Sequence, residues 1–164
     1  GNIYVTGESD GTGTDRDFIT LKYDAAGTLI WSKRYDGAAN STDVAYSISV
    51  DGTGNVFVTG KTMNSAGNYD FATIKYNSSG VQQWVNTYNG IGGHDEAVKV
   101  VIGNGNRLFV LGTGKTVNAN DIVLQKLNYN TGAQLWVCDG IGLGVGGVGV
   151  GEPPPPLPPH AGSV

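Results

Sequence analysis

The stretch Gly112–Thr116 reads GTGKT and raises the question of a phosphate-binding loop. That loop needs a glycine, four further residues and then Gly-Lys-Ser/Thr, because its backbone N–H groups surround the phosphates. Phe109 stands where the first glycine should be, and Asn55 stands there for the related stretch Val58–Thr62, VTGKT. Neither stretch therefore predicts nucleotide binding.

The first glycine-rich loop carries three carboxylates that could bind calcium. Calcium takes six to eight oxygen ligands, which acidic loops can supply. The spacing is not that of the twelve-residue calcium loop, since Arg16 interrupts it and no glutamate closes it. A solvated turn is the favoured interpretation, and the calcium candidates are Asp10, Asp15 and Asp17.

His94, Asp95 and Glu96 are adjacent and could in principle do acid–base chemistry. A catalytic site also needs a nucleophile and a shaped pocket, and nothing in the sequence indicates either. The one cysteine, Cys138, has no cysteine partner in the chain and is predicted to fill space. We therefore expect no catalytic residues and no cofactor.

Composition excludes several partners. Charged residues make up 15% of the 164 residues and the net charge is −4, whereas a nucleic-acid surface needs clustered Lys and Arg. The chain has no run of 18 apolar residues, so no transmembrane segment is predicted. The sequence starts at Gly1 and shows no signal peptide, and we expect a mature product or an excised piece.

The chain consists of related copies about 50 residues long. Trp31 and Trp84 lie 53 residues apart, and Trp136 follows 52 residues after Trp84. Asp17, Asp70 and Asp121 recur in the same way, each five residues before a lysine. The copies span about 1–53, 54–104 and 105–138.

Each copy predicts short antiparallel strands. Segments rich in Val, Ile, Thr, Tyr and Phe, such as 44–50, 55–62, 71–76 and 81–88, alternate with Gly, Asn, Asp and Ser. The first copy begins at its second strand. Four antiparallel strands repeated at this period are typical of a propeller blade, so the predicted fold is all-β, a partial β-propeller of three blades with the outer ones incomplete.

The motifs in Gly1–Gly7 (GNIYVTG) and Asp17–Tyr23 (DFITLKY), with the tryptophan strand after them, resemble the SBBP-type β-propeller repeat of bacterial extracytoplasmic proteins. The resemblance covers about 1–137 in three copies. It implies a blade fold and an extracytoplasmic location, secreted or at the cell surface. The family is defined by its architecture, so the resemblance transfers no catalytic residues.

The recurring residues have structural interpretations. Trp31, Trp84 and Trp136 could stack on carbohydrate, but their matched positions favour packing between blades. Asp17, Asp70 and Asp121 begin a strand, where aspartate often caps a turn. Each lies an odd number of residues from its lysine, which places the two side chains on opposite faces of the strand.

Residues 139–164 form a separate Gly/Pro-rich tail. All six prolines fall within 153–159, and seven glycines lie within 140–151. Such a segment has few large side chains to bury and is predicted to be a disordered tail. The proline run could also be a ligand for an aromatic groove.

These observations favour a non-catalytic scaffold or interaction module of an exported or cell-surface bacterial protein, which binds through loops on a rigid framework. The expected partners are a protein or carbohydrate ligand, and further blades of a parent chain or a second copy. Two alternatives stay open: a segment of a propeller enzyme of hydrolase, lyase or quinone-dependent type, and a calcium-stabilised adhesive module.

Overall fold

The computed structural model describes residues 1–11, 15–115 and 119–139. The predicted tail therefore lies, apart from its first residue, outside the described residues. Eleven strands and no helix occur in the described part of the chain, and none of it could cross a membrane as a helix. The strands are β1 (Ile3–Asp10), β2 (Arg16–Tyr23), β3 (Leu29–Tyr35), β4 (Val44–Val50), β5 (Val56–Met63), β6 (Tyr69–Tyr76), β7 (Gln82–Tyr88), β8 (Glu96–Gly103), β9 (Arg107–Lys115), β10 (Asn120–Leu127) and β11 (Gln134–Asp139).

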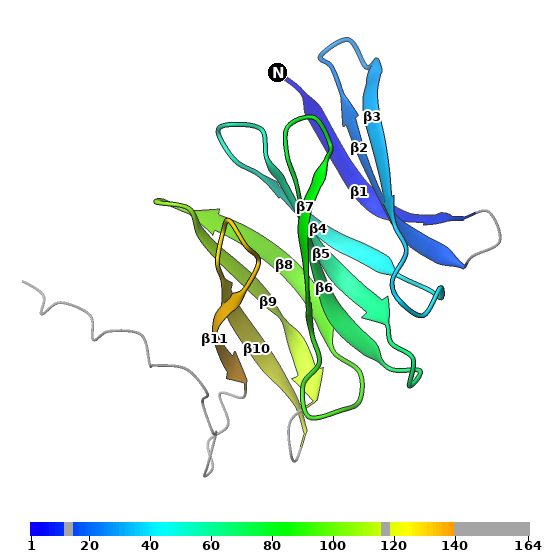
Figure 1. The fold of residues 1–164 in the computed structure, drawn as a ribbon, viewed down its shortest axis with the longest axis vertical. Helices are drawn as coiled ribbons and strands as arrows, with labels where there is room; N and C mark the ends of the chain where they lie inside the picture. The colour runs from blue at the N-terminus through cyan, green and yellow to red at the C-terminus, as the bar shows by residue number, and fades with distance from the viewer. Residues whose placement is uncertain (12–14, 116–118, 140–164) are drawn as a thin grey trace, which may run out of the picture.

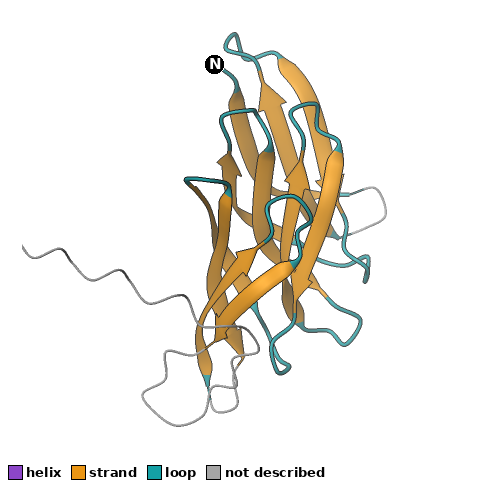
Figure 2. Cartoon of the chain, turned by 60° about the vertical axis from the view of Figure 1, so that its left-hand side comes forward, coloured by secondary structure: helices purple, strands orange, loops and turns teal. Residues whose placement is uncertain are grey.

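The strands form three antiparallel sheets that stack one after another (Figure 1). The first sheet is β1–β2–β3, the second β4–β5–β6–β7 and the third β8–β9–β10–β11, each in chain order. Figure 2 shows that strands and short connections make up the described chain. The all-β prediction and the three-stranded first sheet are confirmed, whereas the third sheet, expected to be incomplete, has four strands.

One turn recurs between the second and third strands of the predicted copies. Asp24, Asn77 and Asn128 each accept, through Oδ1, the backbone N–H two residues later, at 2.9 to 3.0 Å. A glycine with positive φ follows in each turn, at +85°, +79° and +72° for Gly27, Gly80 and Gly132. The short polar side chain replaces a backbone acceptor and the glycine tolerates the left-handed conformation, so these residues determine the hairpin.

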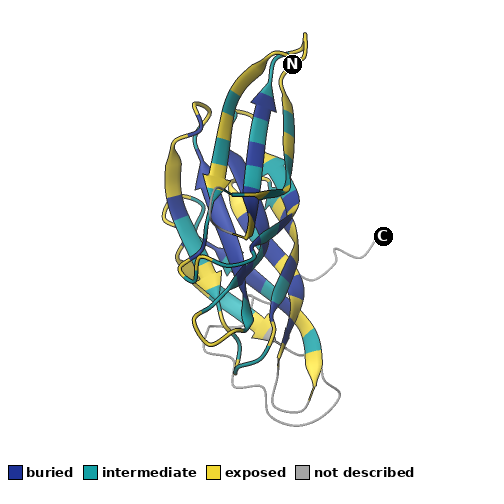
Figure 3. Ribbon diagram, turned by 90° about the vertical axis from the view of Figure 1, so that its right-hand side faces the viewer, coloured by how far each residue is buried: buried dark blue, intermediate teal, exposed yellow. Residues whose placement is uncertain are grey.

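The hydrophobic core lies between the sheets. Phe18 of the first sheet packs against the second sheet, whose residues in this cluster are Ala45, Val56, Val58, Ala72, Ile74 and Tyr76. On the other face of the second sheet, Phe57, Phe71 and Trp84 pack against Ala97, Val100, Leu108, Val110, Val123 and Leu127 of the third. Both faces of the second sheet are therefore buried, as Figure 3 shows for the middle of the stack. Burial also raises the pKa of the Tyr76 hydroxyl to about 12.

Gly60 allows β5 to lie close to β4. A Cβ placed on Gly60 would lie 1.9 Å from the carbonyl oxygen of Val44 and 2.8 Å from the Cα of Ala45. The β4–β5 register shifts at this point, between Ala45 and Ser47. The bulge and the missing side chain thus allow the two backbones to approach.

Gly60→Ala is expected to lower the free energy of unfolding by about 2 kcal/mol, because the added methyl overpacks the backbone of β4. Urea denaturation followed by circular dichroism measures this loss. Gly7→Ala is the matched control: Gly7 occupies the same place in the first sheet, and nothing lies within 4 Å of the position that its Cβ would take. Equal effects of the two substitutions would contradict the explanation.

Candidate functional site

An aspartate links each pair of neighbouring sheets. The Asp43 backbone N–H donates to the Arg16 carbonyl of the first sheet at 2.6 Å. The Asp43 carboxylate accepts the N–H of Gly37 at 2.6 Å and the N–H of Met63, at the end of β5, at 3.1 Å. Asp43 is fully buried. One residue therefore fixes the first sheet, the connecting loop and the second sheet together.

The same linkage recurs between the second and third sheets. The Asp95 N–H donates to the Tyr69 carbonyl at 2.6 Å, and the carboxylate accepts the N–H groups of Gly90 at 2.8 Å and Lys115 at 2.7 Å. We call Asp43 and Asp95 the linking aspartates. Their backbone and side-chain hydrogen bonds are repeated almost without change, so the linkage is a property of the repeat.

A lysine and a tryptophan make the second repeated contact. Lys22 Nζ and Trp31 Nε1 both donate to the Ser78 carbonyl in the next sheet, at 2.8 and 3.3 Å. Lys75 and Trp84 donate in the same way to the Tyr129 carbonyl, at 3.1 and 3.3 Å. These contacts sit at the opposite end of the strands from the linking aspartates.

The indole rings need a glycine in the following sheet. A Cβ on Gly80 would lie 2.9 Å from Trp31 Cδ2, and one on Gly132 would lie 2.6 Å from Trp84 Cδ2. The recurring hairpin glycine therefore serves two purposes, since it supplies the positive φ and the space for the ring. Trp136, in the third sheet, contacts Phe109 of its own sheet at 6.1 Å between ring centroids.

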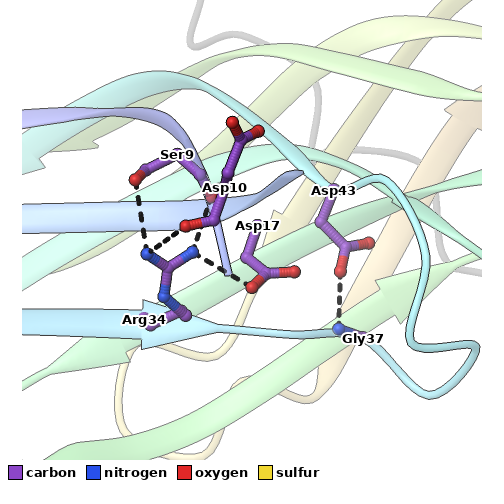
Figure 4. A network of polar contacts seen from close by, with 6 residues as sticks. All are labelled: Ser9, Asp10, Asp17, Arg34, Gly37 and Asp43. Carbon is purple, nitrogen blue, oxygen red and sulfur yellow. Dashed lines mark hydrogen bonds and ion pairs between the residues drawn. The ribbon is translucent and has the colours of Figure 1, made fainter. Parts of the chain in front are cut away.

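Three carboxylates meet at the boundary between the first and second sheets. One oxygen from each of Asp17, Asp36 and Asp43 lies within 4.8 Å of the others. We call these residues the carboxylate cluster. Asp17 is fully buried and accepts a hydrogen bond from Arg34 Nη1 at 3.0 Å. Figure 4 shows Arg34 reaching this cluster from β3.

Arg34 is held by more than Asp17. Its Nη1 also donates to the Ser9 carbonyl at 2.6 Å, and its Nη2 donates to the Asp10 carbonyl at 3.1 Å (Figure 4). A guanidinium with several carbonyl acceptors has a fixed direction. Arg34 therefore joins the end of β1 to the carboxylate cluster and supplies its positive charge.

The calcium candidates Asp10, Asp15 and Asp17 are not one group of ligands in the described residues. Asp17 belongs to the carboxylate cluster, whereas Asp10 contributes a carbonyl to Arg34 and the Asp15 carboxylate accepts from Ser41 Oγ at 3.5 Å. Calcium takes six to eight oxygens. The cluster offers three carboxylates, and Arg34 already provides a cation to one of them.

Burial raises the pKa values of two carboxylates of the cluster, Asp36 and Asp43. It raises the pKa of Asp36 above its ordinary value, and the charges of Asp17 and Asp43 raise it further. Burial also raises the pKa of Asp43, although the hydrogen bonds from Gly37 and Met63 act against it. Asp36 Oδ1 is buried and has no hydrogen-bond partner among the described residues. Asp36 and Asp43 therefore each hold a proton more readily than a separate aspartate would.

Asp36→Asn is expected to raise the melting temperature at neutral pH. Because the folded-state pKa of Asp36 is raised, its favourable contribution is present below its unfolded pKa and is lost as pH rises through the folded value. The neutral amide removes that loss, so the gain should appear at neutral pH and vanish in acid, below the unfolded pKa of an aspartate. Thermal melts at several pH values measure it.

Asp24→Asn is the control for Asp36→Asn. Hydrogen bonds to Thr28, Ala26 and Gly27 lower the pKa of Asp24, so this substitution should not stabilise at neutral pH. Asparagine already occupies the same turn position at Asn77 and Asn128. A gain at Asp36→Asn that is independent of pH would show that charge is not the cause.

The other predicted positions have separate surroundings. Asp70 accepts from Asn64 Nδ2 at 2.9 Å, and Asp121 is half-buried near the end of the third sheet. His94 Nδ1 accepts the Tyr69 backbone N–H at 3.1 Å, and its ring lies 5.4 Å from the Tyr69 ring. Sequence reasoning missed the linking role of Asp43 and Asp95, which their recurrence immediately before the predicted first strand of a blade could have indicated.

The comparisons with known proteins agree with this geometry. Residues 30–65 match the family model SBBP, described as a β-propeller repeat. The matched segment runs from β3 to the loop after β5 and includes Gly37, Asp43 and Met63, so it contains one complete linking aspartate with the groups that donate to it. No curated protein matches the chain. Residues 30–65 therefore match the SBBP β-propeller repeat, and the three stacked antiparallel sheets have the all-β architecture of a partial propeller.

Proposed function

We propose that the chain is a non-catalytic β-propeller scaffold that binds a ligand through the loops at one end of its blades, within an exported or surface-attached bacterial protein. The observation that carries the proposal is that the repeated polar and aromatic side chains make contacts between sheets. The repeated side chains all form hydrogen bonds to a neighbouring sheet or to the loop leading to it: Asp43, Asp95, Lys22, Lys75, Trp31 and Trp84. These side chains therefore hold the stacked sheets together, which leaves the loops for binding.

The two ends of the blades differ. At one end the connections are the short recurring turns around Asp24, Asn77 and Asn128. At the other end the connections between sheets, 36–43 and 89–95, differ in length and sequence, whereas 64–68 repeats the short turn with Asn64 and Gly67. Binding residues commonly lie on variable loops of a rigid framework, so the second end is the proposed ligand-binding end.

Aromatic side chains gather at this end around Lys61. Lys61 Nζ lies 4.3 Å from the centre of the Tyr69 ring and 5.7 Å from that of Tyr46. Tyr46 and His94 are exposed, and Tyr69 is half-buried. Tyrosine rings beside a cation and polar groups can stack on sugar rings and bond to their hydroxyls. We therefore favour a carbohydrate ligand over a protein ligand.

The test is a glycan array probed with the labelled protein and with two variants, Tyr69→Ala and Tyr46→Ala. Binding of an arrayed glycan that is lost in both variants supports the proposal. Val81→Ala is the control, since Val81 is exposed at the other end of the blades. Binding that survives both tyrosine substitutions would place the ligand elsewhere, and a glycan recovered in cleaved form would identify an enzyme.

A further inference from the structure

The first sheet exposes a face that is buried in the other sheets. In the second sheet, the face toward the preceding sheet carries Val56, Val58, Ala72, Ile74 and Tyr76, all at most 2% exposed. We call the corresponding residues of the first sheet the entry face. Ile3 and Val5 of this face are 51% and 45% exposed, and the rest are half-buried: Ile19, Leu21 and Tyr23.

The third sheet exposes its other face, the one that would point toward a following sheet. In the second sheet, the face toward the following sheet carries Phe57, Phe71 and Trp84, which are buried. The corresponding residues of the third sheet, which we call the exit face, are more accessible. Leu111 and Ile122 are 39% and 49% exposed, and the others are half-buried: Phe109, Leu124, Lys126 and Trp136.

The exit face is also more apolar than its counterparts within the stack. Thr59 and Thr73 face the third sheet from the second and bond to each other at 2.8 Å. The matching positions of the exit face are Leu111 and Leu124, which pair directly across β9 and β10. Two leucines in place of a satisfied threonine pair favour burial against another apolar surface.

The two outer sheets carry complementary halves of the repeated lysine and tryptophan contact. Each internal boundary pairs a lysine and a tryptophan with one carbonyl and one glycine of the following hairpin. The third sheet ends with Lys126 and Trp136, which pair directly in its register. The first sheet has the matching hairpin between β2 and β3, where Ala25 holds the position of Ser78 and nothing lies within 4 Å of a Cβ placed on Gly27.

We propose that the exit face binds the entry face of a second copy of this chain, head to tail. Trp136 packs on Gly27 of the next copy, Lys126 and Trp136 donate to the Ala25 carbonyl, and the leucines cover Val5 and Ile19. The contact joins two different surfaces, so it either closes into a ring or continues with further copies. The inference extends the proposed scaffold and depends on no ligand.

The test is sedimentation velocity of the full chain over a range of concentrations, with Val5→Lys on the entry face and Ile122→Lys on the exit face. Both positions are exposed in the single chain, so the fold should persist in circular dichroism. The wild type should associate with increasing concentration. Each variant alone should associate about a hundredfold more weakly, because a lysine would lose its water in the contact.

Mixing the two variants gives the decisive result. The Val5→Lys chain keeps an intact exit face and the Ile122→Lys chain keeps an intact entry face, so an equal mixture should form a dimer and stop there. Ile91→Lys, in the loop before β8, is the control and should associate like the wild type. A wild type that stays monomeric, a variant that associates normally or a mixture without dimer would overturn the inference.

Discussion

Trp84→Ala is expected to lower the free energy of unfolding by about 4 kcal/mol, because a buried aromatic ring is lost from a core that cannot close the space. Trp84 is 8% exposed, belongs to the core between the second and third sheets and donates to the Tyr129 carbonyl. Its ring also fills the space above Gly132. Guanidinium denaturation followed by circular dichroism measures the loss, since tryptophan fluorescence would itself change.

Trp136→Ala is the matched control for this prediction. Trp136 occupies the same position in the third sheet, but there it contacts Phe109 and is half-buried. Measured at concentrations too low for association, its removal should cost less than about 1 kcal/mol. Similar losses for the two tryptophans would mean that contact with the next sheet is not what makes the repeated residue important.

Asp43→Ala is expected to lower the free energy of unfolding by about 3 kcal/mol, because two backbone N–H groups lose a buried charged acceptor. These are the N–H groups of Gly37 and Met63. The same substitution at Asp95 should cost a similar amount, since Gly90 and Lys115 bond to it in the same way. Urea denaturation of both variants measures the two losses.

The control for the linking aspartates is Asp36→Asn, which changes a carboxylate of the same cluster that accepts no hydrogen bond at its buried Oδ1 from the described residues. It removes charge without removing an acceptor from the backbone. If Asp43→Ala were as stable as the wild type, the gain from no longer burying a carboxylate would equal the loss of its hydrogen bonds. Other contacts would then hold the two sheets together.

The fold could be predicted from the sequence because its signals are local. Alternating apolar residues fix the strands, and the turns carry their own acceptors and glycines, as at Asn77 and Gly80. The matched spacing of Trp31 and Trp84 indicated stacked units, since identical large rings at identical positions are typical of repeated packing. These features need no knowledge of distant contacts.

The site could be predicted only in part because its contacts join residues that are distant in the sequence. Asp17 was expected near a turn, but its partner Arg34 lies on the next strand, 17 residues along the chain. The carboxylate cluster combines Asp17 of β2 with Asp36 and Asp43 of the loop after β3. The pairing of β2 with β3 and the return of this loop to Arg16 bring them together. The charged residues near Asp17 were visible in the sequence, whereas its contacts depended on the pairing of β2 with β3 and on the path of the loop after β3.

The most direct test of face-to-face stacking is the nuclear Overhauser spectrum of the folded chain. The indole protons of Trp31 should give cross-peaks to the α protons of Gly80, and those of Trp84 should give cross-peaks to Gly132, because each ring covers the glycine of the following sheet. A spectrum in which both tryptophans contact only residues of their own sheet would contradict the stacked arrangement.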